Sequence, residues 1–430
     1  MTANQPAGVR YLKRPAVVAG DDLAAIEARV RAIIDDVRRN GDEALRRYSL
    51  EFDGYDGALE VETAERQQIV DSLDPGIRED LDYAIANVTR FAEAQRATLQ
   101  PLEIETLPGV HLGHRVIPID RVGVYVPGGR YPILSAAVMT VVPARVAGCK
   151  EIIACLPPKA HPAMIAGCII AGAHRIFRVG GAQAIAAMAY GTASVPEVDK
   201  IFGPGNAYVN EAKRQVFGRV GIDQLAGPSE IFTVADDSGD AAMIAADLLA
   251  QAEHDVRSRV GLITTSEALG QAVLAEIERQ LQTLRTREVA GAAWRDHGEI
   301  AVCDGEAAMI AYSDFIAAEH LQVHTRDSAA TARKLTHYGS LFIGPLASVV
   351  YSDKCCGTNP TLPTMAGARH SGGLWVGSYL KVCTHQWLEP QGVAQVAPHA
   401  VRQAGNEGQW GHQAAAEYRL RLLGINHRLP

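Results

Sequence analysis

The sequence lacks the features that mark a membrane, secreted or nucleic-acid-binding protein. Only 6% of its 430 residues are aromatic, and it has no unbroken apolar run of about 20 residues, the length a membrane helix needs. Its first residues contain no apolar core of a signal peptide. The net charge is −8, and no basic stripe suggests a nucleic-acid partner. We therefore expect a soluble, cytoplasmic protein.

Two common chemical signatures are also missing. The seven cysteines form no CxxC pair and are odd in number, which is typical of buried, reduced thiols rather than of a disulfide framework. No GxGxxG follows any expected strand, so the standard dinucleotide fingerprint is absent. Neither a redox motif nor a nucleotide can be inferred from these patterns alone.

Aliphatic and small residues are abundant instead, with 47% hydrophobic residues and 40 glycines. The length suggests two or three domains. Helical spacing of apolar residues predicts helix over 21–50, interrupted at Asn40-Gly41, and again over about 77–98. The last 50 residues are expected to be mostly helical.

Between these helical regions, short apolar strands alternate with Ala-rich helices, the pattern of an α/β fold with parallel sheets. The expected strands are 151–155, 176–179, 200–202, 230–234 and 260–264. Glycine turns accompany them at Gly128-Gly129, Gly180-Gly181, Gly203-Pro204-Gly205 and Gly227-Pro228. Ligands of open α/β sheets bind outside the carboxyl ends of strands, so we expect a site at these turns.

A possible metal site lies in the segment DLLAQAEHD. Gln251 and His254 are three residues apart and would share a helix face. Both can bind a divalent metal, the histidine through a ring nitrogen and the glutamine through its carbonyl oxygen. Such a pair is more often ordinary polar surface. Asp353, in a loop stiffened by prolines, is a further candidate ligand that could equally cap a turn.

Two further segments could supply acid–base chemistry. Glu319 and His320 are adjacent in AAEHL and could serve two successive proton transfers, because the pKa values of a carboxylate and an imidazole can be set apart. Taken alone, such a pair is more often a solvated glutamate beside a half-buried histidine. Glu407 and His412 flank two glycines near the C-terminus and could reach a neighbouring subunit.

Two amide side chains follow glycine turns. Gln183 stands near an expected helix start, and Asn206 follows the GPG turn. Amides and helix starts at such turns suit a phosphate or an amide-bearing cofactor. Ordinary βα-turn chemistry would account for both residues without a ligand.

Eight segments in order along nearly the whole chain resemble the histidinol dehydrogenase family. They are RVGVYVPGGR (121–130), VGGAQAIAAMAYGT (179–192), VDKIFGPGNAYV (198–209), GIDQLAGPSE (221–230), DLLAQAEHD (247–255), AAEHL (317–321), GTNPTLPT (357–364) and EGQWGH (407–412). Each segment is weak alone, but eight with family-like spacing are highly specific.

The resemblance implies an α/β fold of two incomplete Rossmann-like domains with parallel sheets, small N- and C-terminal helical extensions, and a domain-swapped homodimer. Residues 1–19 would form the N-terminal extension. Residues 20–125 and 231–373 would form the first domain, and 126–230 the second, NAD-binding domain. Residues 374–430 would reach the partner subunit and complete its active site.

The resemblance also implies roles for particular residues. One Zn²⁺ per subunit would be held by Gln251, His254, Asp353 and His412, and the catalytic acid–base pair would be Glu319 and His320. NAD would contact Tyr125, Gln183 and Asn206. The substrate would contact Ser229, Gln251, His254, His320, Asp353, Glu407 and His412.

The implied reaction is the oxidation of a small polar primary alcohol, through a bound aldehyde, to a carboxylate, with two NAD per turnover. His320 would take the alcohol proton, and Glu319 would activate the water that adds to the aldehyde. Zinc would orient the substrate and polarise its oxygen, without a redox role of its own.

The substrate loop departs from the usual family pattern, because Pro360 stands where members usually carry histidine. The segments ARHSGGLWVGSYLK, EHLQVHT and YGSLFIG resemble the sulfopropanediol 3-dehydrogenase branch, which usually carries that histidine too. An anionic alcohol such as 2,3-dihydroxypropane-1-sulfonate is the expected substrate, with Lys354, Arg369 and His370 as plausible partners. L-histidinol is the alternative substrate. A paralogue that binds zinc or nucleotide without turnover is a remote alternative.

Overall fold

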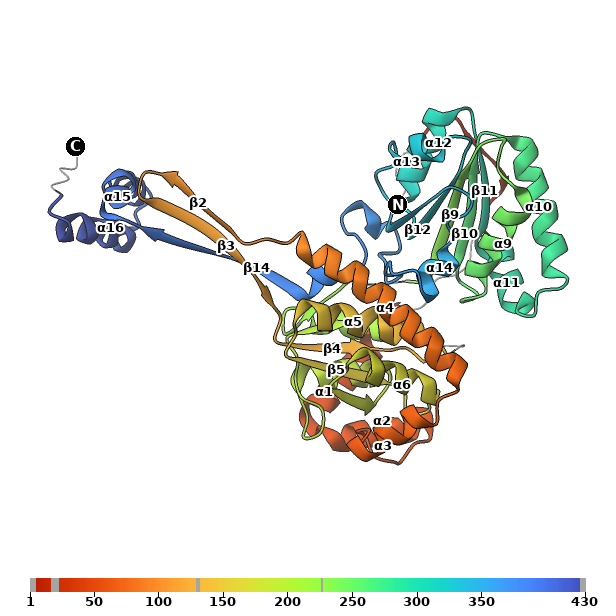
Figure 1. Cartoon of the computed structure of the whole chain (residues 1–430), viewed down its shortest axis with the longest axis horizontal. Coiled ribbons are helices and arrows are strands. Elements are labelled where there is room, and N and C mark those ends of the chain that lie inside the picture. The colour runs from red at the N-terminus through yellow and green to blue at the C-terminus, as the bar shows by residue number, and fades with distance from the viewer. Residues whose placement is uncertain (1–4, 17–22, 129–131, 226, 426–430) are drawn as a thin grey trace. The chain divides into compact units, whose positions relative to one another are not determined.

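The computed structural model describes residues 5–16, 23–128, 132–225 and 227–425. It is a mixed α/β structure that divides into two compact units (Figure 1). Residues 1–95 and 119–379 make up the first unit, and residues 96–118 and 380–430 make up the second. None of the described helices is long and apolar enough to cross a membrane.

One sheet of the first unit has six strands, all parallel except β1. Their order is β1 (Val9–Lys13), β11 (Gly298–Cys303), β10 (Arg259–Thr264), β9 (Glu230–Ala235), β12 (His320–His324) and β13 (Ser340–Ile343). One face packs on α9 (Ala241–Ala252), α10 (Glu267–Leu281), α11 (Arg287–His297) and the short α14 (Val349–Lys354). The other face packs mainly on α12 (Glu306–Ile316), and α13 (Ser328–Ala332) follows β12.

The other sheet of the first unit has five parallel strands. Their order is β6 (Arg175–Arg178), β5 (Glu151–Leu156), β4 (Arg121–Tyr125), β7 (Lys200–Phe202) and β8 (Gly221–Ile222). Its helices are α1 (Leu23–Asn40), α2 (Asp42–Asp53), α3 (Thr63–Asp71), α5 (Ser135–Ala147), α6 (Pro162–Ala171), α7 (Gly181–Tyr190) and α8 (Ala207–Val216). The first unit also contains the 3₁₀ turns η1 (Gly367–Arg369) and η2 (Val376–Tyr379).

The second unit is an antiparallel sheet with two helices. Its strand order is β14 (Leu380–Leu388), β3 (Val110–Pro118) and β2 (Leu102–Leu107), and its helices are α15 (Pro390–Asn406) and α16 (Trp410–Leu422). The helix α4 (Pro75–Ala97) ends within this unit. Its described core cluster consists of Ala397, Val401 and Leu420, and Val110 and Ala404 are also buried, which is a small core for a unit of this size.

The N-terminal helices form as the apolar spacing predicts. Val30, Ile33, Ile34 and Val37 of α1 are buried at helical spacing against α7 and α8. Gly41, with φ of +52°, separates α1 from α2 at the predicted position, because a left-handed residue cannot continue a helix. Together with the parallel strand pairings of both sheets, these helices confirm the predicted α/β class.

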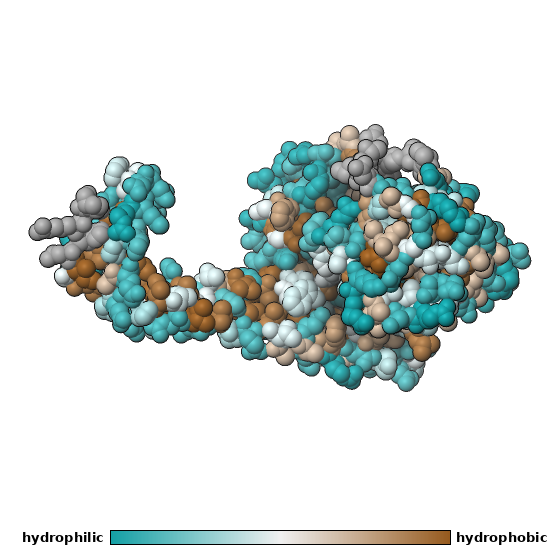
Figure 2. Space-filling model, turned by 90° about the horizontal axis from the view of Figure 1, so that it is seen from above, coloured by the Kyte–Doolittle hydropathy of each residue, from teal (hydrophilic) through white to brown (hydrophobic). Residues whose placement is uncertain are grey.

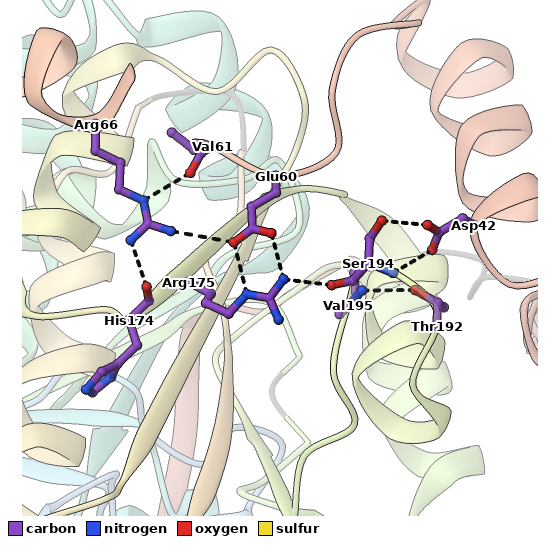
Figure 3. A network of polar contacts seen from close by, with 9 residues as sticks. All are labelled: Asp42, Glu60, Val61, Arg66, His174, Arg175, Thr192, Ser194 and Val195. Carbon is purple, nitrogen blue, oxygen red and sulfur yellow. Dashed lines mark hydrogen bonds and ion pairs between the residues drawn. The ribbon is translucent and has the colours of Figure 1, made fainter. Parts of the chain in front are cut away.

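A network of hydrogen bonds and ion pairs connects residues 42–66 to the five-stranded sheet (Figure 3). Arg175 of β6 donates to both carboxylate oxygens of Glu60, at 2.9 and 2.6 Å, and to the Ser194 carbonyl at 3.0 Å. Asp42, at the start of α2, accepts hydrogen bonds from the Ser194 hydroxyl and N–H. Arg66 of α3 donates to the His174 carbonyl at 2.7 Å. The network thus connects α2 and α3 to β6 and to the segments before β6 and after α7.

The sheets group residues differently from the domain boundaries expected from the sequence. β1 lies within the expected extension 1–19, yet it pairs with β11 in the six-stranded sheet. β4 and α1–α3, placed by the sequence in the first domain, pack with the five-stranded sheet. The C-terminal segment includes the long strand β14 as well as helices. These differences arise from pairings between residues far apart in the chain, which local patterns do not encode.

A buried lysine stabilises the carboxyl edge of the five-stranded sheet. Lys213 of α8 is fully buried, forms an ion pair with Asp223, and donates to the carbonyls of Gly203 and Gln224 at 3.0 and 2.7 Å. Asp223 in turn accepts the Gly203 N–H at 2.8 Å. This cluster joins the turn after β7 to the segment after β8.

We expect Lys213→Met to destabilise the protein by about 3–5 kcal/mol, because it leaves the Asp223 carboxylate buried without its cation. Lys150→Met is the matched control, since the Lys150–Asp120 pair is exposed and worth about 1 kcal/mol or less. Urea unfolding of both variants measures the difference. Equal losses of unfolding free energy in the two variants would show that the buried pair stabilises the protein no more than the exposed pair does.

Candidate active site

Glu319 and His320 stand at the amino end of β12, and the first residue of β9 holds both side chains. The Glu230 N–H donates to Glu319 Oε2 at 2.7 Å, and the Glu230 carbonyl accepts from His320 Nδ1 at 2.9 Å. Both side chains are buried, with residue exposures of 5% and 2%. The parallel pairing of β9 with β12 brings these residues together across about 90 positions of sequence.

This contact fixes the protonation of the imidazole. A carbonyl can only accept a hydrogen bond, so the His320 proton lies on Nδ1 and Nε2 keeps its lone pair. Burial lowers the pKa of His320 to about 4, so the ring is neutral near pH 7. Nε2 is buried and has no hydrogen-bond partner among the described residues. It is therefore a base that no protein donor occupies.

The carboxyl group of Glu319 is perturbed in the opposite direction. Burial raises its pKa well above the ordinary value, although the Glu230 N–H lowers it. The nearby charges of Glu230 and Asp353 raise it further. A carboxylate in such surroundings is a stronger base than one in water, as general-base chemistry requires.

Three of the four expected metal ligands belong to the first unit. Gln251 lies in the last turn of α9, His254 follows that helix, and Asp353 lies in α14. His254 Nε2 and Asp353 Oδ2 are 3.6 Å apart. Both amide atoms of Gln251 are buried without a hydrogen-bond partner among the described residues, which is costly unless a ligand satisfies them.

This arrangement fits a zinc ion. Two atoms bound at about 2.1 Å to a tetrahedral metal lie about 3.4 Å apart, close to the His254–Asp353 separation. Burial lowers the pKa of His254 and raises that of Asp353 to about 6. Among the described residues, no group of three or more His, Cys, Asp or Glu side chains could hold a metal, so the site depends on the Gln251 amide or on a further ligand.

The metal candidates and the bases share one region of the molecule. His254 is close enough to His320 to lower its pKa, and Asp353 is close enough to Glu319 to raise its pKa. Ser229 precedes Glu230 and accepts the Arg259 N–H through its carbonyl at 3.0 Å. On the second unit, Glu407 directly follows α15 and His412 lies in the first turn of α16, and both are exposed there.

Glu230, His254 and the pair Glu319–His320 lie at the amino ends of the parallel strands β9, β10 and β12, respectively. The expectation of a site at carboxyl ends does not hold for them, because α9 carries its polar residues on its last turn, which leads into β10. Glu230 was not recognised from the sequence as a site residue. Its place directly before an apolar strand, in the quoted GPSE segment, was the available signal.

The expected NAD residues do lie at carboxyl ends, in the five-stranded sheet. The Tyr125 hydroxyl, at the end of β4, accepts the Gly181 N–H at 3.1 Å, and burial raises the pKa of Tyr125 to about 12. Gln183 is buried in the first turn of α7. Asn206 caps α8 by accepting the N–H groups of Tyr208 and Val209. The Asn206 side-chain oxygen therefore acts as a helix N-cap, which is its ordinary role in a βα turn.

The glycine turns at these carboxyl ends are required by close packing. A side chain at Gly128 or Gly180 would meet Pro157 within about 3 Å, and one at Gly203 would lie 2.1 Å from the Tyr125 carbonyl oxygen. Gly203 and Gly181 also have φ of +116° and +66°. Gly129 lies outside the described residues. The turns thus bring the backbone close together, with or without a cofactor.

The expected anion partners behave differently from one another. Arg369 donates to the Phe315 carbonyl and stacks over the Phe315 ring, so its guanidinium is already engaged. Lys354 is exposed and close enough to His254 and Asp353 to lower the pKa of each. His370 is exposed, and Pro360 is half-buried in the loop after α14. Of these three residues, Lys354 is the one whose charge acts on the expected metal ligands.

A separate groove of about 630 Å³ lies at the amino ends of β4, β5 and β7. Its charges occur as opposite pairs, among them Arg121–Glu151 at 2.6 Å, Lys150–Asp120 at 2.9 Å and Arg219–Glu197 at 2.6 Å. These three pairs are neutral, and the remaining charge is that of Asp199, whose carboxylate accepts the Arg121 N–H at 3.0 Å. The groove is not part of the site around Glu319.

Known proteins resemble this chain over nearly its whole length. The family model described as histidinol dehydrogenase matches residues 18–420. The chain is 48% identical to histidinol dehydrogenase homolog 1 of Mesorhizobium japonicum, over 98% of this chain and 86% of that protein. It is 43% identical to a histidinol dehydrogenase of Rhizobium meliloti, over 92% of each, and 41% identical to sulfopropanediol 3-dehydrogenase of Ruegeria pomeroyi, over 96% of each.

The fold has a close counterpart among solved structures. The histidinol dehydrogenase of Elizabethkingia anophelis superposes with a TM-score of 0.90 at 34% identity, covering 96% of this chain and 95% of that one. The fold and the paired bases define an α/β oxidoreductase. The chain belongs to the histidinol dehydrogenase family, whose members are NAD-dependent dehydrogenases that act on CH–OH groups.

We expect ¹⁵N NMR of histidine-labelled protein to show His320 protonated on Nδ1 and unprotonated on Nε2 between pH 6 and 8. The carbonyl partner sets the tautomer, and the lowered pKa keeps the ring neutral over this range. His320→Ala identifies the resonances. A proton on Nε2 in the wild-type protein would contradict the assignment of this nitrogen as the base.

Proposed function

We propose that the protein is a zinc-dependent, NAD-linked dehydrogenase that oxidises a small polar primary alcohol, through a bound aldehyde, to a carboxylate, using two NAD per turnover. The observation that carries the proposal is the pair of buried bases held on the Glu230 backbone, beside His254 and Asp353. The two oxidations need one base for the alcohol proton and another for the water that adds to the aldehyde.

His320 is the base for the first oxidation. Its Nε2 takes the alcohol proton while a hydride leaves the same carbon for NAD, and the Glu230 carbonyl stabilises the imidazolium through Nδ1. Glu319 is the base for the second oxidation. Its carboxylate removes a proton from water as the oxygen adds to the aldehyde carbon, and the hydrate then loses the second hydride to a second NAD.

Gln251, His254 and Asp353, completed by His412, would hold one Zn²⁺ per subunit. When bound, the metal would orient the alcohol and polarise its oxygen. The unpartnered amide of Gln251 and the His254–Asp353 spacing support this ligand set. Ser229 and Glu407 would contact the substrate alongside these ligands and His320. NAD would contact Tyr125, Gln183 and Asn206.

We also propose that the active form is a homodimer in which Glu407 and His412 complete the partner's site. The second unit exposes much apolar surface, visible in brown in Figure 2. Its exposed apolar residues include Leu102, Ile104, Leu107, Val382, Trp387, Trp410, Tyr418 and Leu422. A unit with so small a core and so much exposed apolar surface gains stability by covering that surface with another chain.

For the substrate, we propose an anionic alcohol, with 2,3-dihydroxypropane-1-sulfonate as the candidate. The exposed ammonium of Lys354 acts electrostatically on His254 and Asp353, and Pro360 offers no side-chain hydrogen bond to a neutral or cationic ring. L-histidinol is the alternative, favoured by the similarity to histidinol dehydrogenases. A paralogue without turnover is the remote alternative.

The substrate is tested by assaying NADH formation with a panel of alcohols in the presence of zinc. We expect L-histidinol to be turned over at least about tenfold less efficiently than the best anionic alcohol, because a lost polar contact costs about 1–3 kcal/mol. Pro360→His should raise kcat/KM for histidinol. If histidinol is the best substrate of the wild-type protein, the alternative is correct.

The two bases are separated by assaying the half-reactions. Glu319→Gln keeps the shape of the side chain but cannot take a proton, so aldehyde oxidation should fall by about 10²- to 10⁴-fold and alcohol oxidation far less. His320→Ala should slow both half-reactions. The division of labour is refuted if Glu319→Gln slows both equally.

Shared sites are tested by mixing two inactive variants. His254→Ala and His412→Ala should each lose zinc and activity when alone. In a mixed dimer, one site carries both lesions and the other carries none, so activity should return toward half of the wild-type value per mixed dimer. Verified subunit exchange without recovery would place His412 in the site of its own subunit.

A further inference from the structure

The face of β12 that meets α9 carries buried polar side chains where a core strand ordinarily carries apolar ones. His320, Gln322 and His324 have exposures of 2%, 0% and 3%, and they alternate with the buried Leu321 and Val323. The apolar residues face α12, within the other core. A buried polar row has a desolvation cost, which specific hydrogen-bond partners offset. Gln322 has such partners, whereas both ring nitrogens of His324 have none among the described residues.

Asp247 of α9 is the partner at the centre of this row. Its Oδ2 accepts from Gln322 Nε2 at 3.0 Å, and its Oδ1 accepts from the Ser348 hydroxyl at 2.8 Å. Gln322 Oε1 in turn accepts from the Thr233 hydroxyl of β9 at 3.2 Å. Asp247 and Gln322 are buried, with exposures of 9% and 0%.

Each element joined by Asp247 also carries part of the candidate site. Asp247 lies one helical turn before Gln251 on α9, so the two share a helix face. Gln322 lies two residues after His320 on the same face of β12. Ser348 caps α14, the helix that carries Asp353, by accepting the Val350 N–H. Thr233 lies on β9, whose first residue is Glu230.

We propose that Asp247 is a positioning residue that fixes α9, β12 and α14 relative to one another, and so sets the distance of Gln251 and His254 from Asp353 and from the two bases. It touches neither substrate nor metal, and it acts through the residues that do. This inference rests on the proposed zinc-dependent function. Groups that orient metal ligands in this way typically change metal affinity or activity 10- to 100-fold when removed.

The chemistry of the carboxylate gives a conservative variant. A carboxylate can accept from the amide of Gln322 and the hydroxyl of Ser348 at the same time. In Asp247→Asn, the Gln322 amide can reverse, so that Gln322 Oε1 accepts from Asn Nδ2 while Ser348 still donates to the Asn oxygen. Asp247→Ala offers neither acceptor and removes the partner of the buried Gln322 amide and of the half-buried Ser348 hydroxyl.

A matched control exists on the opposite face of the same sheet. Tyr312 of α12 is buried, donates to Glu299 Oε1 at 2.5 Å and shares a hydrogen bond with the Tyr11 hydroxyl at 2.7 Å. Tyr312→Phe removes a buried hydrogen bond of the same domain that joins no site residue. It therefore reports the effect of lost stability alone.

The test measures three quantities for wild type, Asp247→Ala, Asp247→Asn, Ser348→Ala and Tyr312→Phe. They are the zinc dissociation constant by chelator competition, the urea midpoint of the metal-free protein, and kcat and KM with the best alcohol of the panel. We expect zinc binding at least 10-fold weaker and kcat at least 10-fold lower in Asp247→Ala, with much of both restored in Asp247→Asn. Ser348→Ala should weaken zinc binding while sparing the Gln322 contact.

The outcomes separate positioning from simple stability. Tyr312→Phe should lower the urea midpoint while leaving zinc affinity and kcat within about twofold of wild type. Zinc affinity unchanged in Asp247→Ala, or lost equally in Tyr312→Phe, would overturn the positioning role. If Asp247→Ala does not fold, the Asn and Ser348 variants decide by the same criteria. A wild-type protein that binds no zinc would overturn the proposed function, and with it this inference.

Discussion

The structure of the site depends on the backbone of one residue, Glu230. Its N–H and carbonyl hold the side chains of two consecutive residues, Glu319 and His320, whose Cα–Cβ bonds would otherwise point to different sides of an extended chain. One strand pairing therefore fixes both bases, the tautomer of one and the environment of the other. Any shift of β9 against β12 by one residue would exchange the faces and separate the pair.

The position of the metal ligands follows from the direction of α9. Its last turn carries Gln251, and His254 follows directly, so both lie at the carboxyl end of the helix. The helix dipole places partial negative charge there, which favours a cation over an anion. The Asp353 carboxylate adds a full negative charge. The amino edge of this sheet thus suits a metal, whereas helix starts at the carboxyl edge of the other sheet suit a dinucleotide's phosphates.

Much of this could be predicted from the sequence, and the remainder shows what local patterns omit. Helical spacing located α1 and α4, and short apolar runs located β5, β6, β7, β9 and β10, because both signals lie within one element. The grouping of residues into sheets was less predictable, since β1 pairs with β11 nearly 290 positions away and β14 with β3 about 270 away. Glu230 was missed because its role lies in its backbone, which no residue type reveals.

The second unit has a consequence for how the protein is made. Its sheet joins β3 to β14, so the unit cannot close until the ribosome has added roughly 260 further residues, which takes about 15–50 seconds at common elongation rates. During that interval β2 and β3 form at most a hairpin with an open edge and exposed Leu102 and Ile104. The β2–β3 hairpin is thus the part of the second unit that is made first and that must wait for β14 to complete its sheet.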